Sequence, residues 1–442
     1  MPKVYSFSHL KQRKGQGLVL VLSSVICLSF SLDPPSETNQ PCTVTIKNEG
    51  GHYQLYRNNE PYFIKGAGGY KYYEKLKECG GNSVRLWSTK GAREYMDRAH
   101  ALGLTVTLGL ELGHERKGFD YNDKKAVKEQ FEQVKKDILE FKDHPALIMW
   151  GIGNEVDQFA NNYKVWDAVN DIVKFIHETD PKHPTTTMLA GVPIKHIKEI
   201  KKRCPDLDLL SINAFKWIAP VKKDITAAGW TGPYLIGEWG ASGYWESEKV
   251  PWGTFMEETS TQKAEVCQER YKAGIKDNTE RCVGSYVFYW GWKQARTHTL
   301  LSLFSEDGQE TGILDILCKE WTGKERSNRA PTILPIGIDN FQTHKGVYLK
   351  PSSQHMAYTD AKDADGDKLY YYWEIYHEST EKKEGGDMEA KPKAITDLIT
   401  NGKDKSLSFK TPAKEGPYRL YVTVYDGNNH IATANAPFYV KK

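Results

Sequence analysis

The chain has 442 residues, of which 60 are lysine or arginine and 57 are aspartate or glutamate, so its formal net charge is +3. This near balance argues against nucleic acid or an anionic membrane as a partner, because both attract strongly basic proteins. The length accommodates a barrel of about 250 residues together with a smaller domain. The 12 tryptophans and 25 tyrosines can serve as core residues or as flat surfaces that stack on sugar rings.

Residues 1–31 have the pattern of a secretory signal peptide. Basic residues within 11–14 precede an apolar run at 18–30, and small residues follow at the end of that run. The run is shorter than the roughly 20 residues of a membrane-spanning helix. Ile26 stands before Cys27, where lipoprotein signals have a small residue, so lipidation is disfavoured. We therefore expect an exported protein (periplasmic, cell-surface or secreted) without a membrane span.

Six cysteines follow Cys27, and they are scattered through the chain. They form no CxxC pair and no zinc-like Cys/His spacing. Oxidation of some of them fits an exported protein. Cys267 and Cys282 are the closest pair, on a predicted helix and the next strand, where buried free thiols are at least as plausible as a disulfide.

A run of aspartates in the last quarter of the chain raises the question of calcium. These residues are Asp360, Asp363, Asp365 and Asp367. Their spacing does not match an EF-hand loop, which needs a bidentate glutamate at its twelfth position. A solvated turn is the simpler interpretation, and we expect neither a metal nor a cofactor.

The chain from residue 43 onward begins as β structure and then alternates between strands and helices. Residues 43–64 alternate around turn residues and predict a β-hairpin that leads into the first barrel strand. Hydrophobic periodicity predicts helices at 72–79, 92–102, 123–141, 163–178, 194–203, 221–228 and 260–276. Strands are predicted at 82–88, 104–112, 146–152, 185–190, 207–213, 233–237 and 283–290. With the strand that begins at Tyr62, these make eight strands joined by helices, a pattern typical of a closed (β/α)8 TIM barrel.

Helical periodicity stops near residue 328. Short strands at 368–374, 406–410, 418–424 and 430–440 follow, with Asp-Gly and Asn-Gly turns between them. The fold class is therefore α/β, with a catalytic barrel over 43–330 and an immunoglobulin-like β-sandwich over 331–442. The linker is short, contains Pro331 and Pro335, and lacks a Gly/Ser tether. We therefore expect the sandwich to dock on the barrel rather than act as an independent carbohydrate-binding module.

Two of the predicted barrel strands end in a glutamate. Strand 146–152 leads into Gly153-Asn154-Glu155, and strand 233–237 leads into Glu238-Trp239. Active sites of TIM barrels lie at these C-terminal strand ends. Either glutamate alone could be a solvated loop residue. Two in one barrel favour glycoside cleavage, in which one carboxyl group protonates the leaving oxygen and the other attacks or activates water.

Further motifs accompany the two strand ends. They are Gly80-Gly-Asn-Ser-Val-Arg85, Leu112-Gly-His-Glu115 and Tyr289-Trp290-Gly. Over residues 43–330 the chain resembles the retaining β-glycosidases of glycoside hydrolase clan A. Within the clan it is most similar to the family 158 endo-β-1,3-glucanases, which carry an immunoglobulin-like C-terminal domain, and to family 2 TIM-barrel proteins.

The resemblance implies roles for four residues. Glu155 would be the general acid/base and Glu238 the nucleophile, while Asn154 would hold the sugar 2-hydroxyl and Arg85 would keep the nucleophile ionised. The sixth predicted strand ends in Asn213 and has no Tyr or His where many clan members place one against the nucleophile. The partner of Glu238 on that strand therefore remains open.

Other residues near the predicted barrel mouth are candidates for substrate contact. His114 and Glu115 follow the third strand, where a solvated loop is the alternative. Several tryptophans in the mouth loops, Trp239 and Trp245 among them, can form sugar platforms or pack the loops. Trp290 resembles the clan's floor tryptophan and can equally be core.

These observations predict a monomeric, exported, retaining β-glycoside hydrolase. We expect it to cleave within β-1,3-glucan chains such as laminarin by double displacement. One alternative is a hydrolase or transglycosylase that acts on another β-linked glucan. Another is a non-catalytic carbohydrate-binding barrel. Metal-dependent hydrolysis finds no support, because no His/Asp/Glu cluster has ligand spacing.

Overall fold

The computed structural model describes residues 40–341, 343–383, 386–400 and 402–442. These residues all belong to one structural unit. The predicted signal segment, 1–31, lies outside them. Within the described ranges, no helix is both long enough and apolar enough to cross a bilayer.

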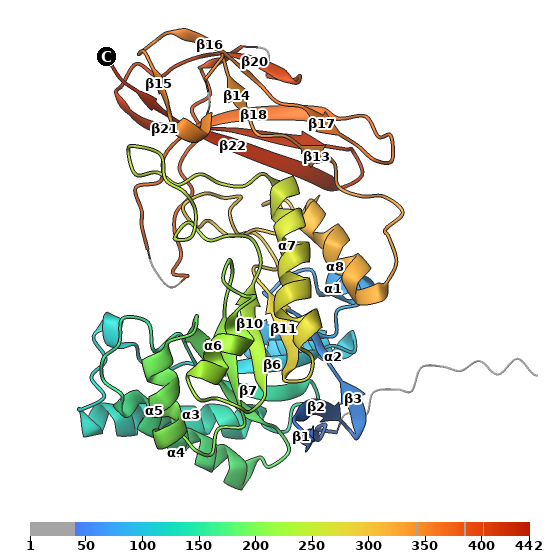
Figure 1. The fold of residues 1–442 in the computed structure, drawn as a ribbon, viewed down its shortest axis with the longest axis vertical. Helices are drawn as coiled ribbons and strands as arrows, with labels where there is room; N and C mark the ends of the chain where they lie inside the picture. Colours follow the sequence, from blue (N-terminus) through green and yellow to red (C-terminus); the bar gives the residue numbers. More distant parts are fainter. Residues whose placement is uncertain (1–39, 342, 384–385, 401) are drawn as a thin grey trace, which may run out of the picture. The chain divides into compact units, whose positions relative to one another are not determined.

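Eight parallel strands close into a barrel, and their order around it follows the chain, with the last strand paired to the first. They are β4 (Ile64–Gly68), β5 (Ser83–Leu86), β6 (Thr105–Leu110), β7 (Leu147–Asn154), β8 (Thr185–Ala190), β9 (Leu209–Asn213), β10 (Tyr234–Trp239) and β11 (Cys282–Val287) (Figure 1). The predicted TIM-barrel fold is confirmed.

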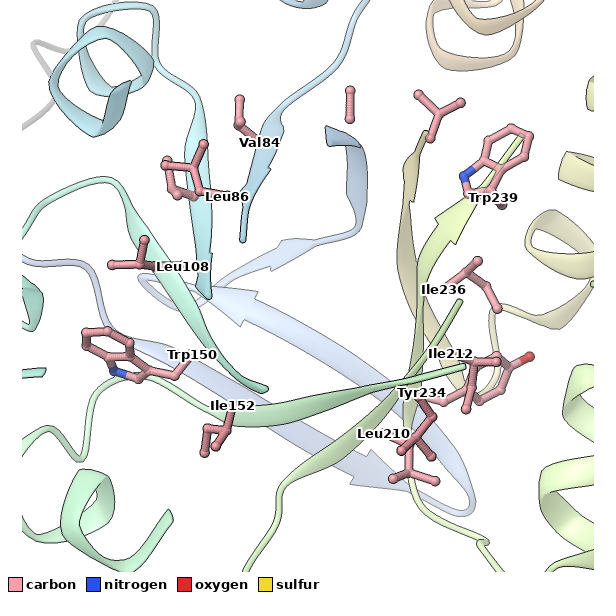
Figure 2. Packing of buried hydrophobic residues seen from close by; sticks show 14 of the residues in the cluster. Val84, Leu86, Leu108, Trp150, Ile152, Leu210, Ile212, Tyr234, Ile236 and Trp239 are labelled. Carbon is pink, nitrogen blue, oxygen red and sulfur yellow. The ribbon is translucent and has the colours of Figure 1, made fainter. Parts of the chain in front are cut away.

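Each barrel strand is followed by a helix. The helices are α1 (Tyr73–Glu78), α2 (Ala92–Ala101), α3 (Lys124–Phe141), α4 (Lys164–Thr179), α5 (Ile194–Arg203), α6 (Val221–Ala227), α7 (Ser260–Gly274) and α8 (Gly312–Thr322). The strands turn an apolar face toward these helices, and Figure 2 shows residues such as Leu108, Trp150 and Ile236 pointing outward from the ring of strands. The inward face is partly polar: the Tyr286 hydroxyl lies 2.8 Å from Ser83 Oγ and 2.6 Å from Thr107 Oγ1.

The expected N-terminal hairpin is a three-stranded antiparallel sheet. It consists of β1 (Val44–Glu49), β2 (His52–Arg57) and β3 (Glu60–Tyr62). Asn58 and Asn59 both have positive φ, at 52° and 67°, as a tight two-residue turn requires, and this turn adds the third strand. Leu55 of the sheet packs in one cluster with Ile148, Leu209 and Leu235 of the barrel strands. The sheet therefore covers the N-terminal end of the barrel and leaves the opposite mouth for a site.

The C-terminal part is a β-sandwich, as expected. One sheet contains β12 (Glu310–Thr311), β15 (Val347–Leu349), β18 (Tyr370–His377), β21 (Gly416–Tyr425) and β22 (His430–Val440). The other contains β14 (Gly337–Ile338), β16 (Gln354–Tyr358), β19 (Ile399–Thr400) and β20 (Ser406–Lys410), and β13 (Thr332–Ile333) pairs with β17 (Ala361–Lys362). Side chains of both sheets share one core, which includes Trp373.

The sandwich is docked on the barrel. Strand β12, which precedes the last barrel helix, pairs in parallel with β22 of the sandwich. Arg419 is buried and donates a hydrogen bond of 2.8 Å to the carbonyl of Phe255, in the loop between β10 and α7. Thr433 N donates to Ser260 Oγ at the start of α7, at 2.9 Å. These buried contacts agree with the docking expected from the short, proline-containing linker.

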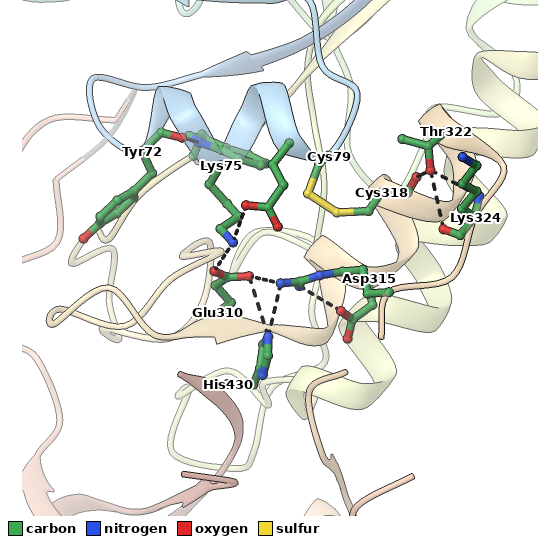
Figure 3. The surroundings of a disulfide bond; sticks show 12 residues. Tyr72, Lys75, Cys79, Glu310, Asp315, Cys318, Thr322, Lys324 and His430 are labelled. Carbon is green, nitrogen blue, oxygen red and sulfur yellow. Dashed lines mark hydrogen bonds and ion pairs between the residues drawn. A yellow bond between two sulfur atoms is a disulfide. The ribbon is translucent and has the colours of Figure 1, made fainter. Parts of the chain in front are cut away.

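A disulfide joins Cys79, at the end of α1, to Cys318 in α8 (Figure 3). Cys267 and Cys282 are free buried thiols, as are Cys42 and Cys204. An ion-pair network lies beside the disulfide: Glu310 contacts Lys75 at 3.2 Å and Arg326 at 2.6 Å, and Arg326 also contacts Asp315 at 2.9 Å. The first and last helices of the barrel are thus connected covalently.

We expect the Cys79→Ser/Cys318→Ser double variant to lose about 2–4 kcal/mol of stability, because the bond restricts a long loop in the unfolded chain. Thermal unfolding with and without a reductant measures this effect. Reductant should lower the Tm of the wild type and leave the Tm of the double variant unchanged. Cys267→Ala, which removes a free thiol, is the matched control and should retain the response to reductant.

Candidate active site

Strand β7 delivers Asn154 and Glu155 to the mouth of the barrel. The register with β8 shifts between Gly151 and Asn154, and Gly153 and Glu155 both take positive φ, at 72° and 52°. The Glu155 amide donates to the carbonyl of Met188 on β8 at 2.8 Å, which holds this turn in place. A non-glycine residue in the left-handed region is a form of backbone strain that is found preferentially at functional sites.

Strand β10, which carries Glu238, also has an irregular register near its C-terminal end. Its register with β9 shifts between Ile236 and Glu238. A Cβ on Gly237 would lie 2.6 Å from Asn213 Oδ1 and 3.4 Å from Arg85 Nη1, so only glycine lets these side chains approach the strand. The shift turns Glu238 toward Arg85 of β5 and leaves Trp239 on the outer face of the strand (Figure 2).

Arg85 connects the two strand ends. Its Nη1 donates to Glu238 Oε1 at 3.0 Å and to the carbonyl of Gly237 at 2.7 Å, and its Nη2 donates to Asn154 Oδ1 at 2.5 Å. Asn213 Nδ2 donates to Glu155 Oε1 at 2.9 Å. Arg85 and Glu238 are both buried, so this pair is largely shielded from solvent screening.

The hydrogen-bond partner of Glu238 that the sequence left open is the residue that directly follows β5. Trp87 Nε1 donates to Glu238 Oε1 at 3.0 Å, whereas Asn213 on the sixth strand hydrogen-bonds to Glu155. Trp87 is a residue that the sequence analysis missed. It stands two positions after Arg85, and alternate residues of a strand share one face, so this spacing was the signal that could have revealed it.

The two glutamates differ in environment. Burial, followed by the negative charge of Glu238, raises the pKa of Glu155 to about 7, although the hydrogen bond from Asn213 opposes this shift. Burial also raises the pKa of Asp157 to about 6. A carboxyl group that is still protonated near neutral pH can act as a general acid.

We expect kcat/KM to fall as the pH rises through about 7, because Glu155 then loses its proton. Asp157 lies two residues away, and its charge contributes to the raised pKa of Glu155. Asp157→Asn should therefore move the alkaline limb of the pH–rate profile to lower pH. An alkaline limb that persists unchanged in Glu155→Gln, assayed on an activated aryl glycoside, would assign the titration to another group.

Both glutamates open into one cavity of about 1570 Å³. His114, Asn154, Asn213 and Trp245 of the predicted site residues also line it. Trp245 is 53% exposed and Trp217 is 68% exposed, so both present ring surface to the cavity. The remaining lining includes aromatic side chains from several mouth loops: Tyr70, Trp87, Phe119, Phe159, Phe215, Tyr244, Phe288 and Tyr289.

Three predicted substrate contacts are corrected. Trp239 is fully buried and packs on Tyr271 of α7, with ring centroids 5.5 Å apart, because the shift in β10 turns it outward. Trp290 is also buried, and its Nε1 donates to the carbonyl of Tyr72 at 3.1 Å. Glu115 Oε2 accepts the backbone amides of residues 161 and 162 at 2.8 and 3.0 Å, so Glu115 secures the loop after Glu155.

We expect Trp87→Phe to lower kcat/KM by roughly 10- to 100-fold, since a hydrogen bond to a charged group contributes about 1.5–3 kcal/mol. The ring is kept, but the donor to Glu238 is lost. Steady-state kinetics on an aryl glycoside should show the loss in kcat. Trp245→Phe changes a cavity-wall indole that packs on Phe215 and Tyr244, and it should alter mainly KM. A purely KM effect for Trp87→Phe would make Trp87 a platform only.

One group of acidic side chains in the described part of the chain has the spacing to hold a metal ion: Asp363, Asp367 and Asp426 in the sandwich. None of these three residues lines the cavity of the two glutamates.

Residues 95–300 match the family described as glycosyl hydrolases family 2, TIM barrel domain. The match covers less than half of the chain, so it shows what the barrel is similar to: the TIM barrel domain of the family 2 glycosyl hydrolases. It confirms the family 2 part of the expected resemblance, whereas similarity to family 158 stays a prediction.

The fold is also similar to that of solved β-glucuronidases. The enzyme from Ruminococcus gnavus is 17% identical, with a TM-score of 0.50, and the match covers 64% of this chain and 53% of that one. The enzyme from Dictyoglomus thermophilum is 19% identical, with a TM-score of 0.47, over 64% of this chain and 54% of that one. This chain therefore spans about half the length of these structures, and the likeness concerns the fold alone. No curated protein matches the sequence.

Proposed function

We propose that the protein is a retaining β-glycosidase that cleaves within β-1,3-glucan chains. The observation that carries the proposal is the pair of strand-end glutamates in one cavity. Glu238 is held by Arg85 and Trp87, and Glu155 is held by Asn213 with its pKa raised to about 7. One carboxyl group is thus oriented by two donors and the other is protonated near neutral pH, which is the division of roles that double displacement needs.

In the first step Glu238 attacks the anomeric carbon while Glu155 gives its proton to the leaving oxygen, which forms a glycosyl-enzyme ester. In the second step Glu155, now a carboxylate, takes a proton from water, whose oxygen attacks the same carbon and releases Glu238. Two inversions retain the anomeric configuration. Asn154, whose Oδ1 is held by Arg85, is placed to hold the sugar 2-hydroxyl through its Nδ2.

The size and lining of the cavity support a polymeric substrate. Its volume of about 1570 Å³ exceeds the roughly 300–1,000 Å³ that is usual for small-ligand sites. Exposed rings such as Trp217 and Trp245 suit the apolar faces of several pyranose units. The choice of the β-1,3 linkage rests on the sequence resemblance to family 158.

Product analysis tests the proposal. Purified protein would be incubated with laminarin, mixed-linkage glucan, cellulose and mannan, and the products separated by chromatography. Laminarin should yield a series of oligosaccharides, and NMR should show that the β anomer forms first. Activity confined to another glucan would refute the linkage, transfer products would indicate a transglycosylase, and an inert but glycan-binding protein would indicate a non-catalytic barrel. Activity should also withstand a chelator.

We further propose that the protein is exported. The signal-like segment supports this, and so does the Cys79–Cys318 disulfide, because disulfides persist mainly in oxidising compartments. Fractionation of the producing cell, with detection of a mature chain that lacks the first residues, tests it.

A further inference from the structure

We infer that a loop of the sandwich forms one wall of the substrate cleft, and that Met388 on this loop contacts a glycan unit remote from the scissile bond. The inference rests on the proposed function, because its ligand is the glycan chain. The loop connects β18 to β19, and we call its described residues, 378–383 and 386–398, the sandwich loop. Five of its residues line the same cavity as Glu155 and Glu238: Lys383, Gly386, Asp387, Met388 and Glu389.

A buried ion pair attaches the sandwich loop to the barrel. Glu389 Oε1 accepts from Arg296 Nη1 at 2.6 Å, and Glu389 Oε2 accepts from the Arg296 backbone amide at 2.5 Å. Both residues are largely buried, so loss of either partner would leave an uncompensated charge. The Arg296 guanidinium also lies 4.2 Å from the ring centroid of Tyr244, another cavity residue. The loop is therefore connected to the aromatic wall of the cleft.

Two further contacts hold the sandwich loop along the rim of the barrel mouth. Lys293 Nζ, after β11, donates to the carbonyl of Gly386 at 2.8 Å. Lys117 Nζ, after β6, lies 2.9 Å from Asp387 Oδ1. Strands β4 and β5 lie between β11 and β6 in the barrel order. The loop thus spans the rim above β5, the strand that carries Arg85 and is followed by Trp87. Such partly exposed pairs add little stability, but they fix where the loop lies.

Met388 is the apolar residue that this arrangement presents to the cleft. Its side chain is 83% exposed although it lines the cavity. The carboxylates on either side of it are paired with Lys117 and Arg296. A flexible, polarizable thioether adapts to irregular apolar surfaces, and the C–H face of a pyranose ring is such a surface. Because Met388 comes from the second domain, we assign it to a unit beyond the one held by the glutamates.

The test compares a long and a short substrate. Laminarihexaose reaches beyond the catalytic glutamates, whereas an aryl β-glucoside occupies only the position beside them. For Met388→Ala, the ratio of kcat/KM on the hexaose to kcat/KM on the aryl glucoside should fall about tenfold, the size of a lost apolar contact in a binding site. The loss should appear in KM for the hexaose. Met388→Trp, which enlarges the platform, should lower that KM.

Lys382→Ala is the matched control, because Lys382 is exposed on the same loop and is not a cavity-lining residue. This variant should keep the wild-type ratio of kcat/KM on the two substrates. An unchanged ratio in both Met388 variants, with an active wild type and unaltered Tm, would overturn the inference and leave the proposed function standing. A wild type inactive on every β-glucan would overturn the proposed function and the inference with it.

Discussion

We expect Glu238→Gln to abolish turnover of every substrate, with kcat/KM lower by roughly 10⁴-fold or more, because no glycosyl ester can form on an amide. The substitution is nearly isosteric, so the contacts with Arg85 and Trp87 (3.0 Å each) lose charge rather than position. Activated aryl glycosides should be lost together with glucans, since both need the nucleophile. Single-turnover assays with an aryl glycoside should show no burst of the leaving group.

Removal of a buried charge opposite Arg85 can also destabilise the fold, so unfolding must be measured alongside activity. Glu238→Asp is the matched control. It keeps the charge of the pair but withdraws the carboxylate by one methylene, and it should retain the fold with an intermediate loss of rate. Normal turnover by Glu238→Gln would exclude Glu238 as the nucleophile.

The second large effect concerns Glu155→Ala. We expect kcat/KM on laminarin to fall by about 10²- to 10⁴-fold, the usual contribution of a general acid. An aryl glycoside with a good leaving group needs little protonation, so its first step should continue and the glycosyl-enzyme should accumulate. Azide, which needs no general base, should then restore turnover and give a β-glycosyl azide.

Glu115→Ala provides the matched control for Glu155→Ala. It removes a second glutamate near the mouth that holds the loop at 161–162 and does not line the cavity. It should lower the Tm without any response to azide. If Glu155→Ala lost activity equally on the aryl glycoside and on laminarin, the acid/base role would belong to another residue.

Local patterns in the sequence were sufficient for the barrel and for its two glutamates. Strands and helices differ in hydrophobic period, and a residue that follows a barrel strand must lie at the mouth. Arg85 and Asn213 followed from the same reasoning, because both also lie at strand ends. The structure brings all of these residues together around Arg85.

The errors arose where position depends on contacts between distant residues. Trp239 was assigned to the cleft because it follows Glu238, but the register shift at Gly237 depends on the approach of Asn213 from β9. Cys79 and Cys318 are separated by 239 positions. Over such a distance, the spacing of cysteines in the sequence does not indicate which of them pair. Met388 lines the cavity because of the position in which the sandwich docks. The short linker indicated that the sandwich docks on the barrel, but not where it docks.

The disulfide between α1 and α8 also changes what a cut in the backbone can do. Residues 79 to 318 form a covalent ring, and this ring contains Arg85, Glu155 and Glu238. A protease that cleaves one loop within the ring produces two chains that the disulfide still joins, so no fragment is released. The strand pairing of the barrel also holds the two chains together. The bond would therefore keep Arg85, Glu155 and Glu238 in one molecule even after the backbone between them has been cut.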